Sequence, residues 1–153
     1  MSIVFKNGDM FSSNADILCH QVNCMGRMGS GIAKTVREKF PNVYEEYMNL
    51  CHFDGMTPDT LLGATQFIKC GNQIIANLFA QRNYGYDGKQ YTSYEAFREC
   101  LKHIGENIPV GTSIAFPHGI GCGLGGAKWE IIVAMIQEEL GNGYEIEVWK
   151  YEG

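Results

Sequence analysis

The spacing of apolar residues predicts that strands and helices alternate along this chain. Six short apolar runs have the length and alternation of strands: 2–6, 17–22, 64–69, 73–79, 113–116 and 144–151. Four segments carry apolar residues three and four positions apart, as helices do: 31–40, 42–51, 92–104 and 128–140. The glycine turn at 70–72 predicts an antiparallel hairpin within an otherwise alternating chain. The pattern therefore predicts a three-layer α/β/α sandwich with a central mixed sheet.

Two glycine-rich loops each follow a predicted strand and precede a predicted helix. The first, CMGRMGSG, covers 24–31, and the second, GIGCGLGG, covers 119–126. Glycine lets a backbone turn sharply and approach a ligand closely. The N-terminus of a helix offers free N–H groups and a partial positive charge, which attract phosphate. Although either loop alone is compatible with a plain turn that binds nothing, two of them on one domain predict a diphosphate held between them.

Neither loop matches the two common nucleotide-binding motifs. Gly26 and Gly31 have the spacing of a P-loop, but two residues intervene before Lys34 and Thr35, so the lysine would lie inside the helix. The dinucleotide fingerprint fails because Lys34 stands where glycine or alanine follows the Gly29-Ser30-Gly31 segment. The sequence therefore argues against a nucleoside triphosphatase and against a dinucleotide-dependent oxidoreductase.

Length, charge and cysteine content narrow the function further. The 153 residues fit a single domain spanning 1–153, and 45% of them are hydrophobic. The net charge of −5 argues against sequence-specific nucleic-acid binding and against an anionic membrane surface, although backbone amides can still bind an anionic ligand. None of the six cysteines forms a C-x-x-C pair, so we expect no structural metal and no cofactor. No apolar run is long enough to span a membrane, and we expect a cytoplasmic protein with reduced thiols.

Five blocks of the sequence resemble the macrodomain family, in the family's order and across nearly the whole chain. They are Asn7–Phe11, His20–Cys24, Met28–Ala33, Pro117–Leu124 and Trp129-Glu130. The resemblance is strongest to the branch of terminal ADP-ribose glycohydrolases, DNA ADP-ribosyl glycohydrolase antitoxins and yeast-type ADP-ribose-1″-phosphate phosphatases. It implies an ADP-ribose site in a cleft at the carboxyl ends of the central strands.

The resemblance also implies which residues contact the ligand. Asp9 would accept a hydrogen bond from the adenine amino group beside the Met10 backbone, and Asn23 would reach a distal-ribose hydroxyl. Without the family, Asp9 closes a turn and Asn23 caps its loop equally well. The remaining implied contacts come from the two loops, which would face the phosphates and the distal ribose: Met28, Gly29, Ser30, Gly31, Ile32, Pro117, Gly119, Ile120, Gly121, Cys122, Gly123 and Leu124.

Catalysis is the point at which this chain departs from its lysine-dependent relatives. Gln81 stands at the lysine position and Gly125 at the aspartate position, and glutamine cannot act as a nucleophile. Four polar residues are the candidates for orienting an attacking water: His20, Asn23, Gln81 and His118. His20 matches a histidine of the phosphatase relatives, although in an apolar run it is also compatible with a structural core histidine.

Three hypotheses follow from these residues. The first is an enzyme that hydrolyses an ADP-ribose derivative, by de-ADP-ribosylation or by dephosphorylation of ADP-ribose-1″-phosphate. The second is a reader that captures free or macromolecule-linked ADP-ribose without turnover. The third is a nucleotide-binding α/β domain of another kind, which would bind ATP or NAD as tightly as ADP-ribose.

Overall fold

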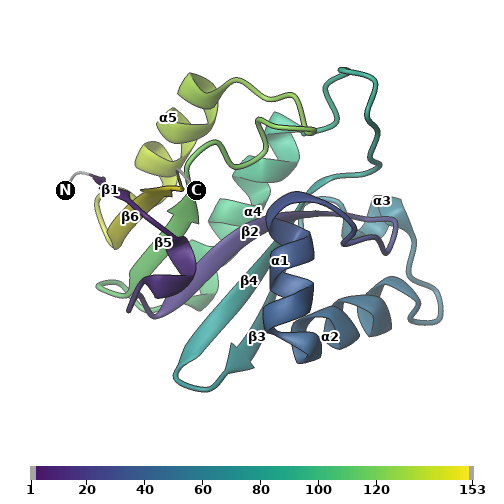
Figure 1. Cartoon of the computed structure of the whole chain (residues 1–153), viewed down its shortest axis with the longest axis horizontal. Coiled ribbons are helices and arrows are strands. Elements are labelled where there is room, and N and C mark those ends of the chain that lie inside the picture. The colour runs from purple at the N-terminus through teal and green to yellow at the C-terminus, as the bar shows by residue number, and fades with distance from the viewer. Residues whose placement is uncertain (1–2, 152–153) are drawn as a thin grey trace.

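A mixed six-stranded sheet forms the centre of the computed structural model, which describes residues 3–151 (Figure 1). The strands lie in the order β1-β6-β5-β2-β4-β3. Every neighbouring pair is parallel except β3 and β4, which form the predicted antiparallel hairpin. The strands are β1 (Val4–Asn7), β2 (Ile17–Asn23), β3 (Thr65–Cys70), β4 (Gln73–Gln81), β5 (Ser113–Pro117) and β6 (Glu145–Lys150). The expected strand start at Ser2 lies outside the described residues.

Helices cover both faces of the sheet and complete the predicted three layers (Figure 1). The helices are α1 (Gly31–Lys39), α2 (Pro41–Cys51), α3 (Pro58–Leu61), α4 (Tyr94–Asn107) and α5 (Trp129–Leu140), with a 3₁₀ helix η1 (Met10–Ser12). Phe97 of α4 and Ile136 of α5 belong to one apolar core, whereas Val36 of α1 and Tyr47 of α2 belong to the other. Among the described residues, every helix is too short or too polar to cross a bilayer.

The short elements are the ones that periodicity did not predict. Helix α3 lies between the predicted helix 42–51 and the predicted strand 64–69, where the pattern predicts neither helix nor strand. Thr57 caps it by accepting a hydrogen bond from the Thr60 N–H, and Pro58 occupies its first turn. Helix η1 is capped in the same way by Asp9, which accepts from the Phe11 N–H at 2.9 Å. One turn of helix is too short to show a hydrophobic period, so the capping residues are the only sequence signal that predicts it.

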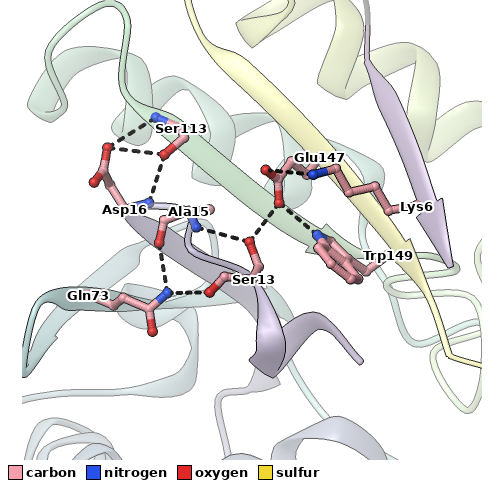
Figure 2. Close-up of polar contacts among 8 residues, drawn as sticks. All are labelled: Lys6, Ser13, Ala15, Asp16, Gln73, Ser113, Glu147 and Trp149. Atoms are coloured by element: carbon pink, nitrogen blue, oxygen red, sulfur yellow. Dashed lines mark hydrogen bonds and ion pairs between the residues drawn. The ribbon is translucent and has the colours of Figure 1, made fainter. Parts of the chain in front are cut away.

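A polar network fixes the segment between η1 and β2 to β6, the strand next to the edge strand β1 (Figure 2). Ser13 Oγ donates to Glu147 Oε1 at 2.6 Å and accepts from the Ala15 N–H at 3.0 Å. Trp149 Nε1 donates to the same carboxylate oxygen at 2.7 Å, and Lys6 Nζ lies 3.5 Å from the other. Burial raises the pKa of Glu147, but these hydrogen bonds and the lysine charge outweigh it, so the pKa lies below its ordinary value.

The same segment is tied to β4 and β5 as well (Figure 2). Gln73 Nε2 donates to the carbonyl oxygens of Ser13 and Ala15, each at 2.8 Å. The Asp16 N–H donates to Ser113 Oγ at 2.8 Å, and Ser113 Oγ donates to Asp16 Oδ2 at 3.1 Å. Three strands therefore hold the chain where it enters β2, the strand that leads to the first glycine loop.

Candidate ligand-binding and active site

The two glycine loops line a single cleft of about 440 Å³. Strands β2, β4 and β5 are neighbours in the sheet, and β2 runs parallel to both of the others, so their carboxyl ends meet at one edge. Four segments line the cleft: the end of β2, the first loop with the start of α1, the loop after β4, and the second loop. A ligand that bridges the two loops therefore needs no rearrangement of the sheet.

The first loop presents the open amino end of α1 to the cleft. Gly29, Ser30, Gly31 and Ile32 all line the cleft, and Gly31 has a φ of +61°, a conformation that side chains disfavour. Ser30 occupies the N-cap position, yet its side chain makes no capping hydrogen bond. The first N–H groups of the helix are thus left to an external acceptor, and a phosphate oxygen is a suitable one.

The second loop is held in shape by the residues that precede α4. Thr92 Oγ1 donates to the Gly121 carbonyl at 2.8 Å, and the Thr92 N–H donates to the Gly125 carbonyl at 2.9 Å. The Ala127 N–H also donates to Gly121 O at 2.9 Å. Gly119 and Gly121 both have φ near +78°, which bends the loop over the cleft.

Gly125 leaves no space for a side chain. A Cβ at this position would lie 2.4 Å from Thr92 Oγ1 and 2.6 Å from the Gly121 carbonyl oxygen. Since the φ of Gly125 is not positive, the constraint is the space alone. The aspartate that lysine-dependent macrodomains place here therefore has no room in this loop.

His20 lines the cleft but is only 1% exposed. Its Nε2 is hydrogen-bonded to Asn77 Oδ1, and its Nδ1 has no partner among the described residues. Burial lowers the pKa of His20 to about 4, and the hydrogen bond to Asn77 offsets only part of that shift. The imidazole is therefore neutral near pH 7.

Asn23 lines the cleft while its side chain organises the first loop. Its Oδ1 accepts from the Met25 N–H at 2.9 Å and from the Tyr47 hydroxyl at 3.0 Å, and its Nδ2 donates to the Arg27 carbonyl at 2.9 Å. The loop-capping alternative is thus present in the structure. One N–H of the amide has no further hydrogen bond in these contacts, so a ligand hydroxyl can still accept it.

Gln81 is locked into a second amide network at the cleft. Its Oε1 accepts from Gln21 Nε2 at 2.8 Å, and its Nε2 donates to the Asn83 carbonyl at 2.8 Å. Gln21 Nε2 also donates to Thr92 Oγ1 at 2.7 Å. The residue at the lysine position therefore braces the second loop through Gln21 and Thr92.

His118 and two tyrosines lie around the mouth of the cleft. The His118 ring packs against Trp129 with a centroid distance of 4.6 Å and remains exposed. Tyr84 and Tyr86 follow β4, line the cleft and are 38% and 70% exposed. These aromatic side chains are available to stack on a ligand or to cover it.

Four of the predicted contact residues do not line this cleft: Asp9, Met10, Met28 and Cys122. Asp9 caps η1, while Met10 and Met28 are buried among apolar neighbours. Cys122 points its thiol at the Ile120 carbonyl at 3.5 Å. The contacts implied for Met28 and Cys122 stay predictions, because they concern the backbone of the two loops and not these side chains.

The structure adds cleft residues that sequence reasoning missed, among them Gln21, Arg27 and Gly85. Arg27 lies inside the first loop. Among the described residues that line the cleft it is the one with a permanent positive charge, and none of them is an aspartate or a glutamate. The position of Arg27 between Gly26 and Gly29 was a sequence signal that could have predicted its place in the cleft. Gln21 gave none, since its partners come from distant segments. Within residues 3–151 no three His, Cys, Asp or Glu side chains gather to hold a metal ion.

Comparison with known proteins assigns the fold to a family. The family model described as Macro domain matches residues 19–136. The chain belongs to the Macro domain family. A protein of unknown function from Bacteroides thetaiotaomicron superposes on this macrodomain with a TM-score of 0.83, at 27% identity and 98% coverage of both chains. The macrodomain of Thermus aquaticus DarG superposes with a TM-score of 0.76 at 26% identity, covering 99% of this chain and 98% of that one.

Two relatives of this chain are named for different activities, one a phosphatase and the other a glycohydrolase. The ADP-ribose 1″-phosphate phosphatase of Meyerozyma guilliermondii is 35% identical over 92 residues, which are 58% of this chain and 52% of that protein. The DNA ADP-ribosyl glycohydrolase of Thermus aquaticus is 26% identical over 148 residues, which are 97% of this chain and 40% of that protein. This macrodomain therefore spans about half the length, or less, of these two relatives.

Proposed function

We propose that this macrodomain binds ADP-ribose in the cleft and hydrolyses a derivative of it at the distal ribose. The main support for this proposal is that the two glycine loops line the same cleft of about 440 Å³, and that the first loop leads directly into helix α1. The names of the relatives support the same ligand, because both the phosphatase and the glycohydrolase act on ADP-ribose derivatives. The derivative is ADP-ribosylated macromolecule or ADP-ribose-1″-phosphate.

Backbone amides supply most of the affinity for the diphosphate in this proposal. The uncapped N-terminus of α1 contacts one phosphate in this proposal, and N–H groups of the second loop contact the other. The N–H groups of Ile120 and Cys122 take no part, because they donate to the carbonyls of Pro117 and Gly119. Arg27 adds a positive charge at the first loop. The arrangement explains how a chain of net charge −5 accommodates an anionic ligand.

Hydrolysis in this cleft depends on positioning a water molecule. The water oxygen attacks either the anomeric carbon or the phosphorus of a 1″-phosphate, its proton passes to an acceptor, and the leaving group departs with the bonding electrons. His20 is neutral near pH 7, so it serves as an acceptor and not as an acid. Asn23 and His118 orient the ligand around the same centre, while Gln81 acts through the second loop that it braces.

A reader without turnover is the second candidate, and two observations favour it. Gln81 has both ends of its amide engaged, and Gly125 has no room for a side chain. The lysine and aspartate of the lysine-dependent relatives thus have no counterparts here. Cytoplasmic placement, independence from cofactors and the lack of sequence-specific nucleic-acid binding stay predictions from the sequence.

Calorimetric titration with ADP-ribose, ATP and NAD tests the binding half of the proposal. We expect ADP-ribose to bind more tightly than the other two. Equal or tighter binding of ATP or NAD would overturn the proposal in favour of a different nucleotide-binding domain.

A turnover assay then separates the enzyme from the reader. The substrates are ADP-ribosylated protein, ADP-ribosylated DNA and ADP-ribose-1″-phosphate. We expect at least one to be consumed and its turnover to fall in His20→Ala and Asn23→Ala. His103→Ala and Asn107→Ala on α4, remote from the cleft lining, are matched controls that should retain activity. Binding of ADP-ribose without consumption of any substrate would establish the reader.

A further inference from the structure

A row of three polar side chains crosses the sheet beneath the cleft. His20 on β2 is the register partner of Asn77 on β4, and Asn77 is the register partner of Gln66 on β3. Asn77 is fully buried, and the row ends at the backbone carbonyl of Glu46 in α2. Cross-strand neighbours on one face of a sheet are close enough for continuous hydrogen bonding.

The hydrogen bonds in this row can run in one direction only. The Glu46 carbonyl accepts and never donates, so Gln66 presents its Nε2 to it, at 3.0 Å. Gln66 Oε1 consequently faces Asn77 and accepts from Asn77 Nδ2 at 2.9 Å. Asn77 then turns Oδ1 toward His20, and this acceptor requires a proton on His20 Nε2. A neutral imidazole carries one proton, so Nδ1 is left with a bare lone pair.

That nitrogen is one of two buried side-chain atoms without a hydrogen-bond partner among the described residues, the other being Gln21 Oε1. His20 Nδ1 is buried and has no hydrogen-bond partner among the described residues, although His20 lines the cleft. Buried polar atoms in native proteins are almost always paired, so an unpaired acceptor at a cleft indicates a donor that arrives with the ligand. Ionised phosphate oxygens carry no proton to donate. The matching donor is an O–H group, which ADP-ribose supplies through its distal ribose or through a water molecule held beside it.

We propose that Asn77 and Gln66 are positioning residues that hold His20 in the Nε2–H tautomer, so that Nδ1 accepts a hydrogen bond from an O–H donor in the loaded cleft. The ligand part of this inference rests on the proposed function, whereas the tautomer part does not. Gln66 and Asn77 touch no ligand in this arrangement, since neither lines the cleft. Their effect reaches the ligand through the imidazole alone.

Nitrogen-15 NMR of the His20 ring tests the tautomer in the free protein. We expect a protonated Nε2 and an unprotonated Nδ1. Gln66→Leu removes the fixed acceptor for Asn77, so the Asn77 amide can turn over and the Nδ1–H tautomer should appear. Gln66→Glu replaces the amide oxygen that faces Asn77 with a carboxylate oxygen, which also accepts, so it should retain the original tautomer.

Gln73→Leu is the matched control, because it also removes hydrogen bonds from a glutamine amide to backbone carbonyls but has no link to His20. It should leave the His20 tautomer unchanged. An unchanged tautomer in Gln66→Leu, or an Nδ1–H tautomer in the unmutated protein, would contradict the proposal that Gln66 and Asn77 set the tautomer of His20.

Titration with ADP-ribose and with ADP tests the ligand part. We expect the Nδ1 resonance to move with ADP-ribose and to stay unchanged with ADP, which lacks the distal ribose. Gln66→Leu should raise the Kd for ADP-ribose in inverse proportion to the fraction of protein that keeps the Nε2–H tautomer, and it should leave the Kd for ADP unchanged. A response to both ligands would assign the donor to a water that the diphosphate holds.

The two proposals fail differently in this titration. If amide resonances of both glycine loops move while Nδ1 does not, ADP-ribose binds and the assignment of Nδ1 is wrong. If neither the loops nor Nδ1 respond to ADP-ribose, the proposed function is wrong. The tautomer measured in the free protein still tests whether Asn77 and Gln66 position His20.

Discussion

At the scale of single residues, His20 couples the stability of the fold to pH. Its imidazole is 1% exposed and neutral, and burial lowers its pKa from 6.5 to about 4. In the unfolded chain the same group takes up a proton at its ordinary pKa. Between these two values the unfolded state binds more protons than the folded state, so stability falls as the pH is lowered through this window.

We therefore expect the free energy of unfolding to drop between pH 6.5 and pH 4 by up to ~3 kcal/mol on account of His20. Urea denaturation at a series of pH values measures it. Carboxylates titrate in the same range, so the comparison with His20→Gln isolates the imidazole: this variant should show a smaller drop. His118→Gln is the matched control, and a drop reduced as much as in His20→Gln would show that the effect is not specific to His20. Parallel pH profiles for His20→Gln and the unmutated protein would contradict the assignment.

Gly125 makes a second prediction at this scale, because the loop has no space for a methyl group there. Gly125→Ala should destabilise the protein by about 1–3 kcal/mol, the usual cost of overpacking, since Thr92 and the Gly121 carbonyl are themselves hydrogen-bonded. Gly123→Ala is the matched control: no atom lies within 4 Å of the added Cβ, and its φ is not positive. Chemical denaturation of the two variants should separate them clearly, and equal stabilities would show that the loop relaxes freely.

At the scale of elements, the entry into β2 is held by side chains rather than by the sheet alone. The Ser13 hydroxyl bridges the Ala15 N–H and the Glu147 carboxylate, which joins this segment to β6 (Figure 2). Glu147 in turn gathers Trp149 and Lys6 around one carboxylate. The edge strand β1 and its neighbour β6 are thereby connected to the strand that leads into the first glycine loop.

Ser13→Ala should lower the free energy of unfolding by about 1–3 kcal/mol, because it leaves the buried Ala15 N–H without an acceptor. It should also raise the pKa of Glu147, which loses one of the hydrogen bonds that stabilise its charged form. Denaturation at neutral pH and carboxyl NMR titration measure the two effects. Ser12→Ala, an exposed neighbour, should change neither, and an equal loss of stability in both variants would assign the effect to η1 instead of to Ser13.

At the scale of the whole molecule, the sequence predicted the architecture well. Six strands, four longer helices and the β3–β4 hairpin follow from periodicity and from the turn around Gly71, because a buried face imposes its period on any sequence that forms it. The two loops could be placed at one edge since each follows a strand and opens toward a helix.

The finer chemistry of the cleft could not be predicted in the same way. The partner of His20 comes from β4 and the next residue in that row from β3, while the partners of Gln21 come from β4 and from the loop before α4. Such pairs depend on strand register, which a single sequence leaves open. The sequence also does not show which residues of the 24–31 loop lie in the core, as Met28 does, and which line the cleft, because that too depends on the tertiary structure.

The order in which the cleft is assembled follows from the strand order β5-β2-β4. Residues 29–33 and 117–125 face each other across the cleft although more than half of the chain's synthesis separates the two. During translation the amino-terminal half emerges with β2 and β4 already able to pair, while the place of β5 beside β2 stays empty. The cleft therefore stays incomplete until residues 113–125 have been synthesised, and a ribosome stalled before residue 113 carries only the first of the two glycine loops.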